Sequence, residues 1–126
     1  MVRRDTVIVT GSSGFIGEAL LSTVAASFRV IGLDRSPPKK LPSNASFEEI
    51  DLTSDESVSR ALAKIRRRGR DTIASVIHLA AYFDLTGEPD PRYEQITVRG
   101  TERLLRELQS LKPKSPARCG PMRTVL

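Results

Sequence analysis

A short apolar run, Val7-Ile8-Val9, is followed directly by Thr10-Gly11-Ser12-Ser13-Gly14-Phe15-Ile16-Gly17. This order predicts a strand, a tight glycine-rich turn and the start of a helix. Gly11 would allow the sharp turn off the strand, Gly14 would let the backbone approach a bound pyrophosphate, and Gly17 would let the helix pack closely on the sheet. The helix would direct its free N–H groups and the positive end of its dipole at that phosphate.

The length and composition of the chain indicate one soluble domain. It has 126 residues, of which 39% are hydrophobic and 28% are charged, enough for a single modest core. The single cysteine, Cys119, excludes an internal disulfide, and the start of the chain lacks an apolar run long enough for a signal peptide or a membrane span. We therefore expect a cytoplasmic protein with no membrane partner. Because much of the net charge of +5 lies after Leu111, nucleic acid is not an expected partner.

Strand and helix patterns alternate along the chain. Strands are predicted at about residues 6–10, 28–33, 47–50 and 75–79. Helices are predicted at about 14–26, after a capping box at 53–56, and from Pro91, behind the N-cap residue Asp90, to about Leu111. The apolar faces of these helices are expected to hold Ile16, Ala19, Leu20 and Val24; Val58, Ala61, Leu62 and Ile65; and Ile96, Leu104, Leu105 and Leu108. The alternation predicts an α/β fold: a Rossmann-type parallel sheet with flanking helices and only four strands, half of a doubly wound domain.

The composition changes after Leu111. Residues 112–121 contain three prolines and no periodicity, so we expect a folded half-domain over 1–111 and a basic, disordered tail over 112–126. With no further strand predicted, nothing would pair with Val76–Leu79 on its outer side. That exposed edge favours self-association.

The motifs together resemble the N-terminal half of the extended short-chain dehydrogenase/reductases, the NAD-dependent epimerases and dehydratases. The resemblance covers about residues 5–111. It rests on the glycine-rich turn, Asp34, Asp51-Leu52, His78-Leu79-Ala80-Ala81 and Val98-Arg99-Gly100-Thr101-Glu102-Arg103-Leu104-Leu105. It implies a chain that binds the dinucleotide NAD, with NADP as the weaker alternative.

The resemblance also implies a role for particular residues. The backbone of Ser13, Gly14, Phe15 and Ile16 would hold the pyrophosphate. Asp34 would accept hydrogen bonds from the ribose of adenosine, and Asp51 and Leu52 would lie at the adenine. Leu79, Ala80 and Ala81 would line the nucleotide at the carboxyl end of the fourth strand, where open α/β sheets bind their ligands.

Two departures from the family bear on catalysis. Thr97 stands where the family usually has asparagine, which puts a proton relay or backbone brace at that point in doubt. The family's Tyr-x-x-x-Lys pair is absent, because Tyr82 and Tyr93 are each followed four residues later by threonine. We therefore predict no catalytic residue, no metal ligand and no turnover by this chain alone. Against the family pattern, we expect a truncated member.

Several residues have two readings. Asp34 would repel a 2′-phosphate whereas Arg35 could bind one, and on balance the pair favours NAD. His78 is expected to be a satisfied residue at the end of a buried strand, not a catalytic one. The mid-helix Gly100 is expected to allow a close approach to a neighbouring element.

Three functions remain open from the sequence. The favoured one is a domain that binds the ADP portion of NAD(H), with an unknown substrate in full-length relatives. The second is a non-catalytic dinucleotide-sensing module. The third is a basic interaction protein that uses the cluster Arg66-Arg67-Arg68-Gly69-Arg70 and the tail, although that cluster is more typical of a solvated helix end that complements the dipole.

Overall fold

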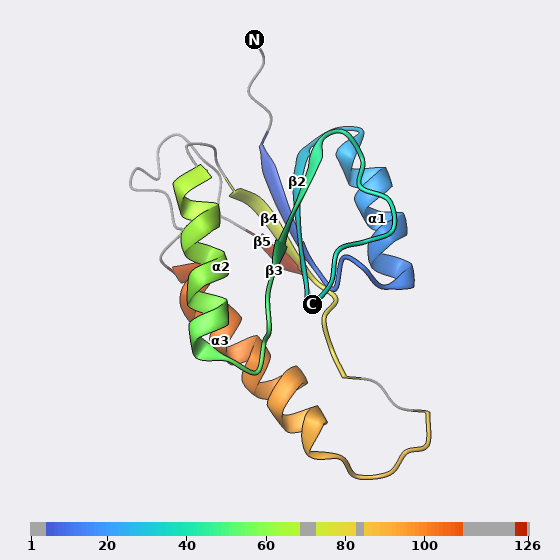
Figure 1. Ribbon diagram of the computed structural model, residues 1–126, viewed down its shortest axis with the longest axis vertical. Coiled ribbons are helices and arrows are strands. Elements are labelled where there is room, and N and C mark those ends of the chain that lie inside the picture. The colour runs from blue at the N-terminus through green and yellow to red at the C-terminus, as the bar shows by residue number, and fades with distance from the viewer. Residues whose placement is uncertain (1–4, 69–72, 83–84, 110–122, 126) are drawn as a thin grey trace.

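The computed structural model describes residues 5–68, 73–82, 85–109 and 123–125. Its strands form one parallel sheet in the order β3-β2-β1-β4-β5 (Figure 1). The strands are β1 (Thr6–Thr10), β2 (Arg29–Asp34), β3 (Ala45–Glu49), β4 (Ile73–His78) and β5 (Arg123–Val125). The helices are α1 (Phe15–Ala25), α2 (Asp55–Arg68) and α3 (Arg99–Leu108), and a π-helical segment, η1 (Tyr93–Val98), leads directly into α3. The predicted α/β Rossmann-type fold is confirmed.

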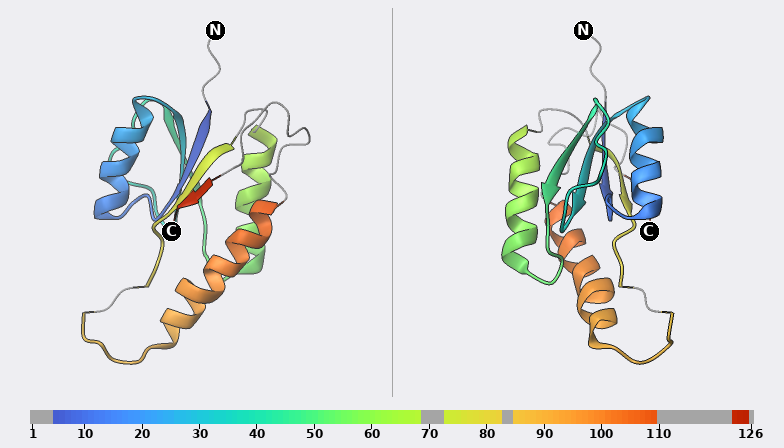
Figure 2. Two further views of the ribbon diagram at one scale, coloured as in Figure 1. Left: turned by 180° about the vertical axis from the view of Figure 1, so that it is seen from behind. Right: turned by 45° about the vertical axis from the view of Figure 1, so that its right-hand side comes forward.

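The two faces of the sheet are covered by different helices (Figure 2). Side chains alternate along a strand, so Val7 and Val9 of β1 point to one face and Ile8 to the other. The first face packs on α1, in a cluster that includes Leu21 and Ala25. The second face packs on α2 and α3, in a larger cluster that includes Leu62 and Leu104. Each helix layer therefore has its own core, and the strands stand between them.

The predicted apolar face is correct for α2 and rotated for α1. In α2 the buried residues are Val58, Ala61, Leu62 and Ile65. In α1 they are Gly17, Leu21 and Ala25, spaced four residues apart, while Ile16 is 67% exposed. The helix turns this stripe inward because only Gly17 lets its backbone come close to the turn that precedes it. In α3, Leu104 and Leu108 are buried as predicted, but Leu105 is exposed.

The helix caps agree in part with the prediction. The backbone N–H of Arg92 donates to Oδ1 of Asp90 at 2.8 Å, as expected of an N-cap aspartate. The N-cap of α2 is Ser54, one residue later than the predicted capping box, since its Oγ accepts the N–H of Ser57 at 3.1 Å. Thr53 is drawn away from capping because its hydroxyl donates to Asp51.

The fifth strand corrects the sequence-based expectation of four. β5 pairs in parallel with β4, with Ser75, Val76 and Ile77 opposite residues 123–125. The expectation that nothing pairs with the outer side of this strand is therefore wrong. Three residues are too few to show a periodic pattern, although Thr124 and Val125 are β-branched and favour strands. The rest of the predicted disordered tail, 112–122 and 126, lies outside the described residues.

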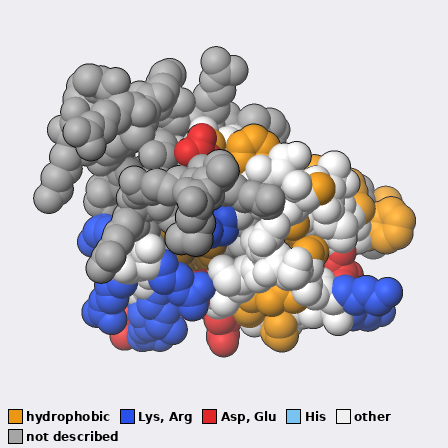
Figure 3. All heavy atoms as spheres, turned by 90° about the horizontal axis from the view of Figure 1, so that it is seen from above, with side chains coloured by type: hydrophobic (Ala, Val, Ile, Leu, Met, Phe, Trp, Pro, Cys, Tyr) orange, Lys and Arg blue, Asp and Glu red, His pale blue; other side chains and the backbone are white. Residues whose placement is uncertain are grey.

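Part of the arginine cluster has a structural role. Lys and Arg side chains gather on one side of the face in Figure 3, and the last turn of α2 contains Arg66, Arg67 and Arg68. Arg68 and Lys64 both pair with Glu48, a β3 residue whose side chain is 9% exposed. These cations thus neutralise a buried carboxylate, as expected for a charge that folding removes from water.

Among the described residues, no helix is long and apolar enough to cross a membrane.

Candidate functional site: a cavity at the carboxyl ends of the strands

A cavity of about 480 Å³ lies where β1, β2, β3 and β4 end. Open parallel sheets bind ligands at this edge. The predicted site residues that line the cavity are Gly11, Gly14, Asp34, Arg35, Asp51, Leu52, Leu79, Ala80 and Ala81. Ser13, Phe15, Ile16 and Gly17 do not line it; they form the turn and the first turn of α1 beside it. Leu33, Ile50, Thr53, Tyr82 and Ile96 also line the cavity and were not predicted.

Two glycines shape the turn between β1 and α1. Gly11 has a φ of +69°, and a Cβ added to it would lie 2.9 Å from the backbone nitrogen of Ala80. Both its conformation and its packing therefore require glycine. A Cβ on Gly17 would collide with the carbonyl of Gly11 and lie 2.8 Å from Cα of Ser12. The second glycine thus lets the helix start directly against the turn.

Gly14 differs from these two glycines. Its φ of −78° suits any residue, and an added Cβ would have only the carbonyl oxygen of Gly11 nearby, at an ordinary 3.5 Å. Because Gly14 lines the cavity, a side chain at this position would take up space at the cavity wall.

The carboxylate of Asp34 is held at the edge of the cavity by two backbone groups. Its Oδ2 accepts the N–H of Ser13 at 3.0 Å, and its Oδ1 accepts the N–H of Arg35 at 2.7 Å. Each carboxylate oxygen can accept a further hydrogen bond. The N–H groups of Ser13 and Gly14 already have acceptors, so the helix start offers those of Phe15 and Ile16, which have no acceptor within a helix.

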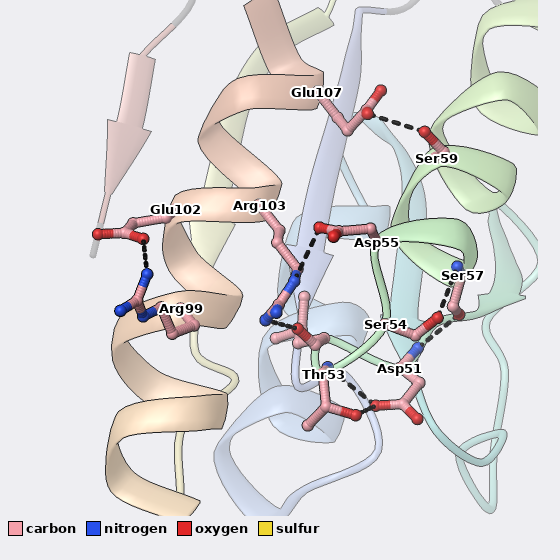
Figure 4. A network of polar contacts seen from close by, with 11 residues as sticks. Asp51, Thr53, Ser54, Asp55, Ser57, Ser59, Arg99, Glu102, Arg103 and Glu107 are labelled. Carbon is pink, nitrogen blue, oxygen red and sulfur yellow. Dashed lines mark hydrogen bonds and ion pairs between the residues drawn. The ribbon is translucent and has the colours of Figure 1, made fainter.

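Asp51 is fixed by its neighbours in the loop after β3 (Figure 4). Its Oδ1 accepts the N–H and the hydroxyl of Thr53, at 2.9 and 2.6 Å, and its own N–H donates to Oγ of Ser57 at 2.8 Å. The bonds from Thr53, with smaller contributions from the charges of Arg35 and Arg103, hold the pKa of Asp51 below its usual value. Among the described residues, Oδ2 of Asp51 has no hydrogen-bond partner. A charged acceptor is therefore available at the cavity.

His78 is satisfied inside the fold, as predicted. Nδ1 lies 2.6 Å from the hydroxyl of Thr10 and Nε2 lies 2.9 Å from the hydroxyl of Thr101. The oxygen of Thr10 already accepts the N–H groups of Leu79 and Ala80, so its hydroxyl donates to Nδ1 and the proton of the imidazole is on Nε2. Burial lowers the pKa of His78. The histidine is thus a neutral brace beneath the loop after β4.

Thr97 braces the same loop. Its hydroxyl oxygen accepts the N–H of Tyr82 at 3.0 Å. The threonine found in place of the family's asparagine therefore supplies one backbone brace, although its single hydroxyl cannot offer the donors and acceptor of an amide.

Tyr82 brings an aromatic contact to the wall of the cavity. Tyr82, which lines it, packs edge-to-face on Tyr93 with ring centroids 4.9 Å apart, and the guanidinium of Arg92 lies 4.4 Å from the centre of its ring. The hydroxyl of Tyr82 donates to Asp90 at 3.2 Å. Hydrogen bonds from Arg92 hold the pKa of Asp90 far below its usual value. The sequence offered one signal that Tyr82 lines the cavity: it is a bulky residue directly after the predicted site residues Leu79–Ala81.

No metal centre is found in the described part of the chain, which holds no group of three or more His, Cys, Asp or Glu side chains placed to bind an ion. The polar groups around the cavity instead include backbone N–H donors and the two carboxylate acceptors, Asp34 and Asp51. That set suits a ligand with phosphates and several hydroxyl or amine hydrogens.

Known proteins share both the sequence and the fold. The chain is 30% identical over 105 residues to N-acetyl-alpha-D-glucosaminyl-diphospho-ditrans,octacis-undecaprenol 4-epimerase of Escherichia coli O157:H7, covering 83% of this chain and 29% of that protein. It is 35% identical over 108 residues to 3-beta-hydroxysteroid dehydrogenase of Mycolicibacterium neoaurum, covering 79% and 27%. The chain thus spans less than a third of the length of these two relatives.

A solved structure has the same fold at low sequence identity. The short chain dehydrogenase of Leptospira borgpetersenii with bound NAD+ superimposes with a TM-score of 0.69 and 19% identity, covering 86% of this chain and 46% of that one. The model of the NAD dependent epimerase/dehydratase family matches residues 7–120. Since that match takes in the glycine-rich turn, Asp34, Asp51 and helix α3, the chain belongs to the NAD-dependent epimerase/dehydratase family.

Proposed function

We propose that this chain binds the ADP portion of a nicotinamide dinucleotide, with NAD preferred over NADP. The observation that supports this most directly is Gly14, where neither the backbone angle nor the packing requires a glycine and the free space opens into the cavity. A pyrophosphate beside Gly14 would accept the N–H groups of Phe15 and Ile16 at the positive end of α1. Asp34 would then accept the hydroxyl hydrogens of the adenosine ribose, and Asp51 and Leu52 would lie at the adenine.

The preference for NAD rests on Asp34. Its carboxylate is held in place from both sides by backbone N–H groups, and it would lie beside the ribose, where the 2′-phosphate of NADP adds negative charge. Arg35 lines the cavity as well and favours the phosphorylated cofactor. We expect Asp34 to outweigh Arg35. Its carboxylate is fixed beside the ribose, so it would repel the 2′-phosphate of NADP in any orientation of that phosphate.

The nicotinamide, when bound, supplies hydride transfer. The names of the relatives, an epimerase of a lipid-linked sugar and a hydroxysteroid dehydrogenase, fit a substrate of the whole protein that is a secondary alcohol or its ketone. The residues of this chain would bind and orient the cofactor. The sequence contains no Tyr-x-x-x-Lys, so they would not supply the family's general acid and base.

Calorimetric titration with NAD tests the binding site. The chain should bind NAD measurably but weakly, and Gly14→Val should abolish binding because its side chain would occupy the space of the phosphate. Ala19→Val, on the exposed side of the same helix, is the matched control and should bind as the unchanged chain does. Unchanged affinity in Gly14→Val would place the nucleotide elsewhere.

Titration with NADP tests the preference. The unchanged chain should bind NAD more tightly than NADP, and Asp34→Ala should remove or reverse that difference. Equal affinity for both cofactors in the unchanged chain would contradict the role of Asp34 and would point to Arg35.

A further inference from the structure

Helix α3 contacts the loop that follows β3. We call residues 51–55 the adenine loop, because Asp51 and Leu52 are the proposed adenine contacts. Within the loop, Asp51 is fixed by Thr53, and Ser54 caps the start of α2. From outside the loop, α3 makes two further contacts with Leu52 and Asp55, through Gly100 and Arg103.

The first contact is a close approach at Gly100. A Cβ added to Gly100 would lie 2.8 Å from Cβ of Leu52 and 3.3 Å from its carbonyl oxygen. Real Cβ atoms are not found so close, so any side chain at position 100 would displace Leu52. Leu52 lines the cavity and is 6% exposed. The position of α3 therefore limits where the loop can lie.

The second contact is a fork of hydrogen bonds from Arg103, one turn after Gly100 (Figure 4). Nη1 donates to the carbonyl oxygen of Leu52 at 3.1 Å, and Nε donates to Oδ1 of Asp55 at 2.9 Å. The side chain of Arg103 is 23% exposed, while that of Asp55 is 73% exposed. One guanidinium thus joins the backbone of the adenine loop to the first residue of α2.

Arg99 lies on the same helix but, within the described part of the chain, makes no polar contact with the adenine loop, so it can be compared with Arg103. It pairs with Glu94 and Glu102, both residues of its own helical segment, and its side chain is 60% exposed. Exposed pairs of this kind contribute little. The fork from Arg103 differs because it reaches a backbone carbonyl of the loop itself.

We propose that Arg103 is a positioning residue for adenine recognition, which fixes the adenine loop so that the unpartnered oxygen of Asp51 can accept the 6-amino group of adenine. This inference rests on the proposed function. It predicts a selective effect: loss of Arg103 should weaken ligands that carry the 6-amino group and leave those without it unchanged.

Nicotinamide hypoxanthine dinucleotide is the probe, because its base carries a 6-oxo group, with a hydrogen on N1, where NAD carries the 6-amino group. A hydrogen bond to a carboxylate contributes enough for the unchanged chain to prefer NAD by about tenfold or more. In Arg103→Met that ratio should fall to about threefold or less, through weaker binding of NAD. Calorimetry or NMR titration of both dinucleotides gives the ratio. Arg99→Met is the matched control and should keep the full preference.

Arg103→Lys separates position from charge. Lysine keeps the positive charge near Asp51 but cannot present two donors in a fixed fork, so the preference should fall as in Arg103→Met. Full preference in the lysine variant would show that charge alone acts and would overturn the inference. Gly100→Ala should also lower the ratio, because its added Cβ would displace Leu52. This variant provides the test if neither Arg103 variant folds.

The remaining outcomes are distinct. An unchanged ratio in folded Arg103→Met and Gly100→Ala overturns the positioning role, as does an equal loss of affinity for both dinucleotides. If the unchanged chain binds neither dinucleotide, the proposed function fails and the inference fails with it. If it binds both with equal affinity, the proposed function stands and only the adenine contact, with the positioning role, is overturned.

Discussion

Replacing His78 with leucine tests whether the hydrogen bonds beneath the cavity hold the fold together. The substitution keeps an apolar side chain of similar size at a site that is 8% exposed, but removes the bonds to Thr10 and Thr101. Each bond contributes about 1 kcal/mol, and the hydroxyl proton of the fully buried Thr10 loses its acceptor, which costs about 1–3 kcal/mol. Allowing for overlap between these effects, His78→Leu should lower the free energy of unfolding by about 2–4 kcal/mol.

The same histidine predicts a pH dependence. Burial lowers the pKa of His78 from its usual value of 6.5, so the unfolded chain binds a proton more readily than the folded chain. The stabilisation is complete above pH 6.5 and is lost as pH falls from there toward the folded-state pKa. Between pH 7.5 and 5.5 the loss is at most about 1.4 kcal/mol. The chain has one histidine, so this window isolates His78 from the other side chains.

Urea unfolding followed by far-ultraviolet circular dichroism at the two pH values measures both effects. The unchanged chain should lose stability at the lower pH, and His78→Leu should be less stable throughout and nearly flat between them. Adding Thr10→Val to His78→Leu should cost less than the two single changes together, because each removes the partner of the other. A loss below about 0.5 kcal/mol at neutral pH, or the same pH slope in both proteins, would refute the argument, since exposed substitutions commonly fall within that range.

Three further predictions concern the turn, the chemistry and the sheet edge. Gly17→Ala should unfold the chain or destabilise it by more than about 3 kcal/mol, because its Cβ would meet backbone at Gly11 and Ser12; urea unfolding no different from that of the unchanged chain would contradict this. The purified chain should not reduce NAD with a panel of sugar nucleotides and alcohols, since losing the general acid and base alone costs about 10²–10⁴ in rate, and steady reduction would prove the expectation wrong. Removal of residues 123–126 should increase the mass measured by light scattering, because it uncovers the outer edge of β4; equal masses for both chains would argue against association through that edge.

The first four strands and the edge of the sheet that carries the cavity could be predicted because their signals are local. Val7–Val9 is a continuous apolar run, as a strand buried on both faces requires, and Gly11 marks a turn that only glycine adopts. Asp34 and Asp51 follow directly after predicted strands, which places them at one edge in any parallel sheet. No knowledge of packing was needed for these predictions.

The orientation of α1 could not be predicted in the same way. Phe15, Ile16 and Ala19 are apolar yet exposed, at 95% and 67% for the first two, so the periodic pattern fits more than one inward face. The close contact at Gly17 decides between them, and it depends on where the turn backbone lies. Likewise β5 depends on pairing with a distant strand, which three residues of sequence do not reveal.

The contacts that hold the cavity in shape from a distance are least visible in the sequence, because they come from one later helical segment, η1 and α3. Thr97 accepts the N–H of Tyr82, Thr101 bonds to His78, and Arg103 donates to the loop after β3. The loops that line the cavity precede these residues in the chain, so the site is complete only after η1 and α3 have packed on the sheet. The residues proposed to contact the nucleotide can be named from motifs, whereas the residues that hold them in place are found only from distances in the structure. Substitutions at Thr101 and Arg103 should therefore change nucleotide binding, although neither residue is proposed to touch the ligand.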